Sequence, residues 1–313
     1  MENSSFNSLT LQLEGLNISK DAVHPVFVFF LFFYIFIMMA NASIAILILV
    51  EKSLHQPMYL LFCNLPFNDM MGNTMIVPRL LADILRPPSE RLIGFHECVL
   101  QAFIIHLFAT SSHTVLMIMA FDRYVAICRP LRYASIMTTR MVVKLTASAW
   151  GLASVWIVIL IGLTVRLTRC RTLIMNPYCD NASLFKLSCE SVFVNNMYGY
   201  IFAVVLFSSS VGSVALTYAR ITVACLTSNN KSLNSKALKT CSTHLVLYLI
   251  LLVSGLTVII LHRFPQFSEQ RKLMAILLQI IPSSLNPIIY GVQSAEIIKS
   301  ISKLIRSKSV PLV

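Results

Sequence analysis

The stretch Met119-Ala-Phe-Asp-Arg-Tyr-Val-Ala-Ile-Cys128 decides which fold this chain is expected to adopt. It overlaps the end of an apolar run from Leu107 to Phe121, so Asp122 and Arg123 stand where that run ends. A charged pair at such a position is typical of a membrane boundary and not of the hydrocarbon core. Because adjacent helical residues point about 100° apart, Asp122 can hold the Arg123 guanidinium while Arg123 keeps donors for another helix. The pair therefore predicts an interhelical latch, with two simple interface anchors as the alternative.

The composition is that of a membrane protein. Hydrophobic residues make up 57% of the 313 residues and charged residues 12%, with a mean hydropathy of +0.76. Soluble domains carry about 25% charged residues. A helix crosses a bilayer with roughly 20 apolar residues, and seven such segments fit the chain with short loops between them. We therefore expect an all-α membrane protein, a seven-transmembrane helix bundle that accounts for nearly the whole chain.

Three parts of the chain are expected. Residues 1–24 are polar and form an extracellular tail, residues 25–292 form the seven-helix bundle, and residues 293–313 form a short cytoplasmic amphipathic helix and tail. That C-terminal helix is predicted because apolar residues recur at helical spacing with basic residues among them, which favours the inner leaflet surface. The apolar residues are Ile297, Ile298, Ile301, Leu304 and Ile305. Membrane lipids are therefore expected partners, and an ordinary solvated tail is the alternative.

Charge and glycosylation signals predict the orientation. A net charge of +12 would suggest nucleic-acid binding in a soluble protein. Topology explains it better here, since the loops expected in the cytoplasm hold most of the excess positive charge. Asn3-Ser-Ser and Asn17-Ile-Ser are glycosylation sequons, usable only when the N-terminal tail faces the lumen during synthesis. We expect a multi-pass plasma-membrane protein with an extracellular N-terminus and no nucleic-acid partner.

The second expected span, residues 57–82, is the least hydrophobic of the seven and contains Asp69. A carboxylate within a bilayer is costly unless it faces the interior of the bundle and finds partners there. Asn41 lies in the inner half of the first span. These two side chains predict an internal polar or cation site. The alternative is a buried Asp that neighbouring amides satisfy and that does not switch.

The long segment before the fifth span contains Cys170, Cys179 and Cys189, and Cys98 begins the third span. A long loop without regular secondary structure in a compact bundle usually has a function. These four cysteines lie on the side expected to be oxidising, and four cysteines permit three pairings. A metal site is the rival hypothesis because His96-Glu-Cys98 offers ligands. Since no Cys-x-x-Cys or His-x-x-x-His spacing supports it, we expect disulfides and no metal.

Four motifs resemble those of odorant receptors of the rhodopsin-like G protein-coupled class. The decapeptide Met119 to Cys128 is similar to the third-helix signature Met-Ala-Tyr-Asp-Arg-Tyr-Val-Ala-Ile-Cys, with Phe121 in place of Tyr. The other motifs are Pro57-Met-Tyr with Leu65-Pro-Phe-Asn-Asp69 in the second helix, Lys236-Ala-Leu-Lys-Thr-Cys-Ser-Thr-His-Leu245 at the foot of the sixth, and Pro282-Ser-Ser-Leu-Asn-Pro-Ile-Ile-Tyr290 in the seventh. His262-Arg-Phe264 is more similar to the fish-like branch, whose ligands tend to be water-borne and polar.

The resemblance implies a receptor that binds a small-molecule odorant and activates a heterotrimeric stimulatory (olfactory-type) G protein. It implies the disulfides Cys98–Cys179 and Cys170–Cys189, and it makes Asp69 the cation-coordinating or hydrogen-bonding centre of the bundle. Pro287 cannot donate to the helix ladder, so it is expected to kink the seventh span. The residues expected to switch or to couple to the G protein are Asp122, Arg123, Tyr124, Tyr218, His244, Asn286, Pro287 and Tyr290.

The chemistry of the ligand is inferred from charge. Basic residues crowd the outer ends of the expected spans, where a guanidinium can bind a carboxylate or sulfate through two parallel hydrogen bonds. These residues are Arg79, Arg166, Arg169, Arg263, Arg271 and Lys272. We expect an anionic small molecule anchored by Arg263. The alternative is snorkelling to lipid headgroups or pairing with Asp180, Glu190 and Glu269. Helical spacing predicts the cavity walls as Phe103, His106, Leu107, Thr110, Tyr200, Ser254, Thr257 and Val258.

Two other classes of protein remain open on sequence grounds. A membrane transporter of a small polar solute would share the intramembrane carboxylate and the broken helices, but transporters usually contain repeated halves, and this chain shows none. An intramembrane enzyme needs a nucleophile beside a base. His113, His244 and several serines are candidate groups, but no nucleophile-base spacing stands out among them. The sequence therefore predicts neither an enzyme nor a cofactor.

Overall fold

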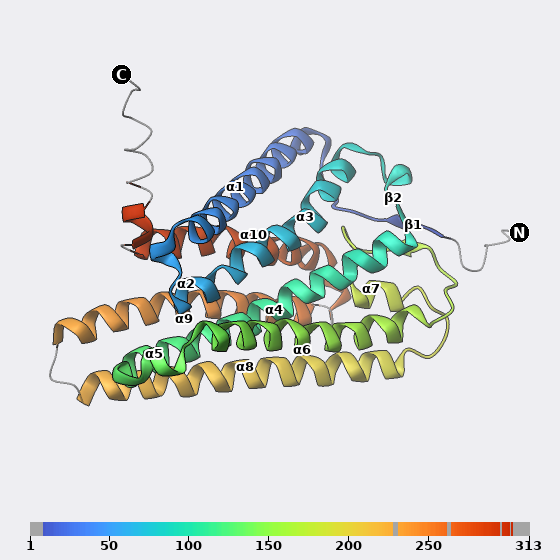
Figure 1. The fold of residues 1–313 in the computed structure, drawn as a ribbon. Helices are drawn as coiled ribbons and strands as arrows, with labels where there is room; N and C mark the ends of the chain where they lie inside the picture. Colours follow the sequence, from blue (N-terminus) through green and yellow to red (C-terminus); the bar gives the residue numbers. More distant parts are fainter. Residues whose placement is uncertain (1–8, 228–230, 262–263, 295, 301, 303–313) are drawn as a thin grey trace, which may run out of the picture.

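The structure, a computed structural model, describes residues 9–227, 231–261, 264–294, 296–300 and 302. Within these residues, seven helical spans form one bundle (Figure 1), which confirms the predicted fold class. The spans are α1 (Val23–Val50), α2 (Pro57–Phe62) with α3 (Asn64–Leu85), α4 (Phe95–Cys128), α6 (Thr139–Val165), α8 (Phe193–Thr227), α9 (Lys231–Leu261) and α10 (Ser268–Gln293). The connections contain α5 (Tyr133–Ile136), α7 (Asn181–Phe185) and short 3-10 turns at Lys20–Ala22, Lys52–Leu54, Pro88–Glu90, Pro130–Arg132 and Pro265–Phe267.

The two ends of the bundle carry different features. Helix α4 runs from one end to the other, with Cys98 near its beginning and Asp122 and Arg123 near its end. We call the end that contains Cys98 the disulfide end, which is on the right in Figure 1. The end that contains Arg123 is called the Asp-Arg end and is on the left.

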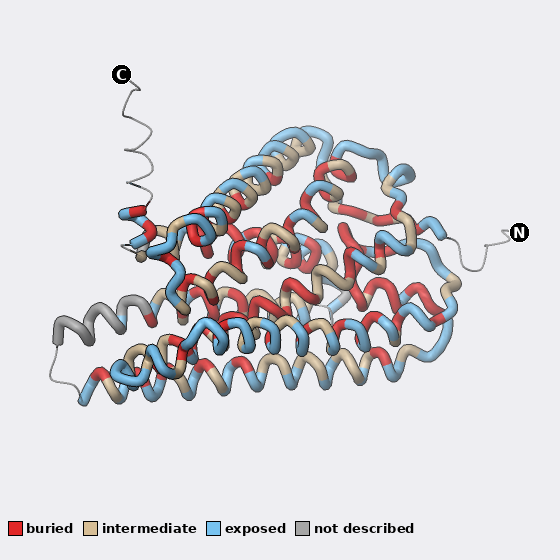
Figure 2. Tube along the Cα trace, in the orientation of Figure 1, coloured by how far each residue is buried: buried red, intermediate tan, exposed pale blue. Residues whose placement is uncertain are grey.

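The helices differ in how they face a membrane. Six helical segments of the described residues are long and apolar enough to cross one, and they are 20–50, 95–128, 139–165, 193–227, 241–261 and 268–291. The remaining span, α3, is more polar because it carries Asn68, Asp69 and Asn73, and all three are buried. It packs against α1, α4 and α10, whereas α8 is exposed over much of its length (Figure 2). Helix α3 is therefore an interior helix, and α8 presents apolar side chains to lipid.

Prolines and one hydroxyl cap mark several helix boundaries. Helix α2 begins at Pro57, whose fixed φ suits the first helical position. Helix α4 ends at Cys128, two residues before Pro130, because the residue that precedes a proline disfavours the helical conformation. Helix α6 begins after Thr138, whose hydroxyl accepts a hydrogen bond of 3.3 Å from the backbone N–H of Met141.

The N-terminal segment adds a small sheet that the sequence analysis missed. Strand β1 (Thr10–Leu13) lies between the antiparallel strand β2 (Leu92–Gly94) and the parallel strand β3 (Leu173–Ile174). Its Leu11 and Leu13 side chains are fully buried, so part of the expected polar tail belongs to the folded structure. The alternation of Leu9, Leu11 and Leu13 is the period-two signal of a strand and could have predicted β1.

The described C-terminal residues return to the bundle. Residues 296–300 are helical, and Ile297 is fully buried in the apolar cluster at the Asp-Arg end, while Ile298 is exposed. One buried and one exposed isoleucine fit an amphipathic helix. The other residues of the predicted apolar face, Ile301, Leu304 and Ile305, lie outside the described residues, so the rest of this helix stays a prediction.

Gly72 permits a close approach of three interior helices. A Cβ atom at Gly72 would overlap with Gln279 Nε2 on α10 and would lie 2.6 Å from a ring carbon of Phe108 on α4. At Gly151 on α6, by contrast, nothing lies within 4 Å of the same position. A methyl group at residue 72 must therefore displace its neighbours, and one at residue 151 meets open space.

We predict that Gly72→Ala destabilises the purified protein by about 1–3 kcal/mol, since overpacking a core forces the surrounding side chains to shift. Gly151→Ala is the matched control. It should be neutral or stabilising by up to about 1 kcal/mol, because alanine favours a helix over glycine. Thermal unfolding of both variants in detergent measures the difference, and equal melting temperatures would contradict the close packing at Gly72.

Candidate functional site

At the Asp-Arg end, Asp122 and Arg123 form a direct ion pair. Arg123 Nε donates a hydrogen bond of 3.0 Å to Asp122 Oδ2, and Arg123 Nη2 donates to the same oxygen. The other carboxylate oxygen, Oδ1, accepts a hydrogen bond of 2.9 Å from the Tyr133 hydroxyl. Burial and the Asp122 carboxylate raise the pKa of Tyr133, so its phenol remains a donor. Asp122 is 1% exposed and has a partner on each oxygen.

A cavity of about 290 Å³ lies beside this ion pair. Asp122, Arg123, His244 and Tyr290 line it. Tyr218 lies one contact further away, since its hydroxyl is 2.5 Å from His244 Nδ1. The structure therefore brings together five of the eight residues predicted to switch, from α4, α8, α9 and α10.

The other three predicted switch residues lie elsewhere. The Tyr124 ring faces Arg129, whose guanidinium carbon is 5.9 Å from the ring centroid. Pro287 is buried inside α10. Asn286 belongs to the internal polar site around Asp69, which it contacts directly.

The internal polar site links α1, α3 and α10. Ser283 Oγ donates to Asp69 Oδ1 at 3.1 Å, and Asn286 Nδ2 donates to Asp69 Oδ2 at 2.8 Å. Asn73 Nδ2 donates to the Asp69 backbone oxygen and to Ser283 Oγ, both at 2.8 Å. Asn41 Nδ2 donates to the Ser283 carbonyl at 3.0 Å. Neighbouring amides and a hydroxyl thus satisfy the buried Asp69, and cation binding there stays a prediction.

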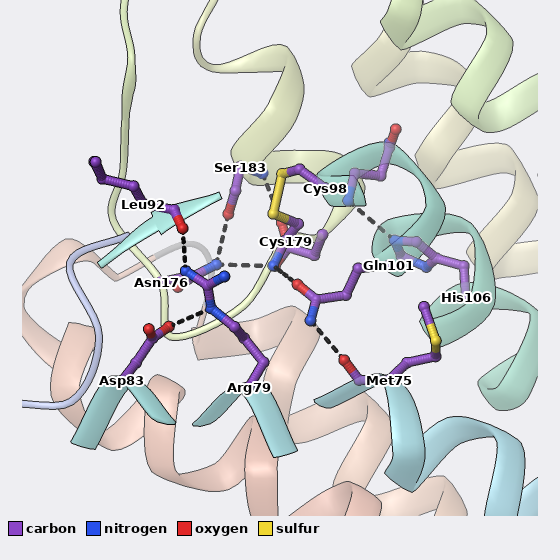
Figure 3. The surroundings of a disulfide bond; sticks show 12 residues. Met75, Arg79, Asp83, Leu92, Cys98, Gln101, His106, Asn176, Cys179 and Ser183 are labelled. Carbon is purple, nitrogen blue, oxygen red and sulfur yellow. Dashed lines mark hydrogen bonds and ion pairs between the residues drawn. A yellow bond between two sulfur atoms is a disulfide. The ribbon is translucent and has the colours of Figure 1, made fainter. Parts of the chain in front are cut away.

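At the disulfide end, two disulfides hold the loop between α6 and α8. They are Cys98–Cys179 and Cys170–Cys189, the pairing that the resemblance implied. Gln101 supports the first disulfide, as Figure 3 shows. Its Oε1 accepts a hydrogen bond of 2.8 Å from the Cys179 backbone N–H, and its Nε2 donates to the Met75 carbonyl at 2.6 Å. The Cys98 sulfur is in a disulfide and is not available as a metal ligand.

Two basic residues at the disulfide end pair with acids of this chain. Arg79 Nε lies 2.8 Å from Asp83 Oδ2 (Figure 3). Lys272 Nζ lies 2.8 Å from a Glu14 carboxylate oxygen and 2.7 Å from a Glu269 oxygen, although the Lys272 side chain is only 1% exposed. These contacts support internal pairing, the simpler of the two explanations, for Arg79 and Lys272.

Other basic residues at this end also contact the protein. Arg271 Nη2 donates to Asn176 Oδ1 at 3.0 Å. The Arg169 guanidinium carbon lies 3.5 Å from the centroid of the Phe95 ring. Arg263 lies outside the described residues, so its role as an anchor for an anion stays a prediction.

The predicted ligand-binding residues lie in several environments. On α4, His106 Nε2 accepts a hydrogen bond of 3.2 Å from the Asn181 backbone N–H, which ties it to the disulfide-held loop. Leu107 and Thr110 are buried below it, and Phe103 is partly buried. Ser254, Thr257 and Val258 are partly buried on α9, whereas Tyr200 on α8 is 36% exposed. Whether these residues share one cavity stays a prediction.

Three buried polar side chains form a cluster that the sequence analysis missed. Ser210 Oγ on α8 lies 3.2 Å from His113 Nδ1 on α4 and 2.5 Å from the Tyr248 hydroxyl on α9. The three residues are 0%, 3% and 2% exposed, respectively. In the sequence these three residues stand among several other serines and threonines of apolar spans, and only the fold shows that they are neighbours. The cluster joins α4, α8 and α9 within the bundle.

The fold and these sites define a class of protein. Seven helical spans, an Asp-Arg pair at one end, an Asn-Pro-x-x-Tyr element beside its cavity, and a disulfide from the third span to the long loop are the features of a rhodopsin-like G protein-coupled receptor. Neither a transporter nor an intramembrane enzyme accounts for this combination of features.

Comparison with known proteins gives the family. The olfactory receptor family model matches residues 30–308. Olfactory receptor 56A5 of Homo sapiens is 37% identical over 83% of this chain and 83% of its own length. Olfactory receptor 8G17 of Mus musculus is 32% identical over 94% of this chain and 95% of its own length. The chain belongs to the olfactory receptor family and is therefore a multi-pass, odorant-sensing receptor and not an enzyme.

We predict that Tyr248→Phe destabilises the purified receptor by about 0.5–1.5 kcal/mol, because it removes the hydroxyl that bonds to the buried Ser210. Tyr34→Phe on α1 is the matched control and should lie within about 0.5 kcal/mol of the parent protein. Thermal unfolding in detergent distinguishes the two variants. If both melt at the same temperature, the hydrogen bond from Tyr248 does not stabilise the bundle.

Proposed function

We propose that the receptor lies in the plasma membrane with the disulfide end outside and the Asp-Arg end in the cytoplasm. Disulfides persist in oxidising environments, which supports an outward position for Cys98 and Cys179. Asn17 is exposed, as a glycan acceptor must be, and Asn3 lies outside the described residues. Strand β1 pairs beside the disulfide-held loop, which supports an extracellular N-terminal segment. Lys299, which is exposed, then meets lipids of the inner leaflet.

The receptor transmits odorant binding to a stimulatory, olfactory-type G protein through Arg123. The observation that carries this proposal is the ion pair between the buried Asp122 and the partly exposed Arg123, beside a cavity that Tyr290 also lines. An odorant that binds one bundle packing better than the other shifts the population towards it. In the active packing, Arg123 exchanges Asp122 for contacts with the G protein. Tyr218 and Tyr290 then occupy the space that the Arg123 side chain has left.

The polar site around Asp69 couples the two ends. Its hydrogen bonds tie α3 to α10 through Ser283 and Asn286. Pro287 follows Asn286 directly and leaves the helix ladder without a donor, so α10 can bend at this point. A movement of α10 that alters the Asp69 contacts therefore also moves Tyr290 at the Asp-Arg end.

We predict that Arg123→Ala reaches the cell surface but gives no cyclic AMP response to an odorant that activates the parent receptor. The physical reason is that alanine keeps the helix but removes the guanidinium that contacts the G protein. Lys144→Ala, a change at an exposed residue of α6, is the control and should retain the response. Surface expression is measured in parallel. A full cyclic AMP response from Arg123→Ala would rule out transmission of the signal through Arg123.

The odorant is a small anionic, water-borne molecule bound in a cavity near the disulfide end, in line with the resemblance to the fish-like branch. Support comes from the crowding of basic residues at the outer ends of the expected spans. Arg79, Arg271 and Lys272 bond to groups of this chain and are not proposed as the anchor. Arg263 is the basic residue that we propose as the anchor. A guanidinium in a partly dry site binds a carboxylate through paired, charge-assisted hydrogen bonds.

We predict that Arg263→Ala loses most of its sensitivity to carboxylic acid odorants, with a rise of about tenfold or more in the effective concentration, as expected for a lost charge-assisted bond. Neutral odorants should be affected little. Arg166→Ala, at an exposed arginine of the disulfide end, is the control. A cyclic AMP screen of acids, amino acids, amines and neutral odorants tests the idea, which fails if Arg263→Ala responds unchanged to every active acid.

A further inference from the structure

The cavity at the Asp-Arg end has the make-up of a small-molecule site. One wall is apolar and comes from α2, α4 and the residues after α10, namely Met58, Phe62, Met119 and Ile297. The cavity is also lined by His244 of α9 and Tyr290 of α10, which carry polar groups. Its volume of about 290 Å³ is close to the lower end of ligand sites, which is roughly 300 Å³. Apolar walls with a few convergent polar groups are the usual composition of such sites.

Two buried polar atoms at this cavity have no hydrogen-bond partner among the described residues. They are His244 Nε2 and the Tyr290 hydroxyl oxygen, and both residues line the cavity. His244 is 2% exposed, and its Nδ1 is already engaged by Tyr218. In one tautomer Nε2 needs an acceptor, and in the other it needs a donor. A buried polar atom without a partner costs free energy, so a molecule that bonds to both atoms stabilises this packing.

The charges around the cavity argue for an uncharged ligand. Both oxygens of Asp122 are taken, by Arg123 and by Tyr133. An anion would have to displace Asp122 from Arg123 and would approach the exposed Glu296 carboxylate, which also lines the cavity. A cation would be attracted by Glu296 but repelled by the Arg123 guanidinium, so neither kind of ion is favoured by both charged groups. A neutral head group avoids both repulsions.

We propose that this cavity binds an uncharged amphiphile whose head both donates and accepts a hydrogen bond, as a primary amide does. The apolar body lies along Met58 and Met119, and the head bonds to His244 and Tyr290. The bound molecule bridges α2, α9 and α10 and holds the packing in which Arg123 stays with Asp122. Its consequence for signalling rests on the proposed function: it opposes coupling to the G protein from the cytoplasmic side.

The probe for the binding experiment is 4-butylbenzamide, which combines an amide head with a short apolar body. At a saturating concentration it should raise the melting temperature of the purified wild-type receptor by about 2 °C or more, since a ligand that binds only the folded state stabilises it. Met58→Trp fills the cavity from a partly buried position and should abolish the rise. Met141→Trp is the matched control, with the same substitution at a 37% exposed methionine of α6, and should keep it.

A second variant tests the proposal even if Met58→Trp does not fold. Tyr290→Phe retains the ring but removes the hydroxyl, so the dissociation constant of the probe should rise about fivefold. No temperature rise for the wild-type receptor, an equal rise for Met58→Trp, or unchanged affinity for Tyr290→Phe would each overturn the proposal. This binding assay contains no G protein, so its outcome is separate from the cyclic AMP result for Arg123→Ala.

The signalling arm uses the same probe in cells. The probe should lower the odorant-evoked cyclic AMP response of the wild-type receptor and of Met141→Trp, but not that of Met58→Trp. If the cyclic AMP response is undiminished at a probe concentration that raises the melting temperature, the inhibitory effect is overturned, whereas binding at the cavity is still supported.

Discussion

The constraint on which the whole structure depends is that a bilayer offers no water to the polar side chains of a bundle interior. Each such side chain must find its partner on another part of the protein or pay the cost of desolvation. In this receptor the partners come mostly from other helices. Asp69 on α3 is satisfied by Ser283 and Asn286 of α10, and Ser210 on α8 bonds to Tyr248 of α9. These hydrogen bonds specify which helices are neighbours, whereas the apolar side chains around them supply most of the packing.

Helix α4 forms hydrogen bonds to other elements along its whole length. Near the disulfide end, Gln101 bonds to α3 and to the disulfide-held loop. Further along, Ser112 accepts a hydrogen bond of 2.8 Å from Asn68 of α3, and His113 lies against Ser210 of α8. At the other end, Asp122 bonds to Tyr133. A displacement of α4 near the disulfide end would therefore alter its contacts with several other elements between that end and Arg123.

The sequence was sufficient for the features that local pattern determines. The apolar runs predicted seven spans, because a helix of limited length is the main solution to crossing a bilayer. The adjacency of Asp122 and Arg123 predicted their contact, since neighbouring helical residues lie within reach. The disulfide pairing came only from the resemblance to a family, because four cysteines alone allow three arrangements.

Partners that lie far apart along the chain could not be predicted in the same way. Nothing in the sequence marks Tyr133 as a partner of Asp122. Their hydrogen bond forms only because the chain turns back at Pro130. His113, Ser210 and Tyr248 stand on three different spans, and hydrophobic pattern does not encode which faces of those spans meet. Strand β1 is a different case, because its alternating leucines were present in the sequence, and the polar composition of the tail obscured them.

The two partners of Asp122 make the Asp122–Arg123 ion pair compatible with the switch that we propose. Removing one member of such a pair commonly costs roughly 3–5 kcal/mol, because the other charge is left buried and uncompensated. A latch with that full cost would hold the receptor in one packing. Here the Tyr133 hydroxyl donates to the second oxygen of Asp122, and Tyr133 follows α4 in a separate short helix, α5. In the proposed active packing, in which Arg123 turns towards a G protein, Asp122 keeps one hydrogen bond, so opening costs less free energy than it would if Asp122 were left without a partner.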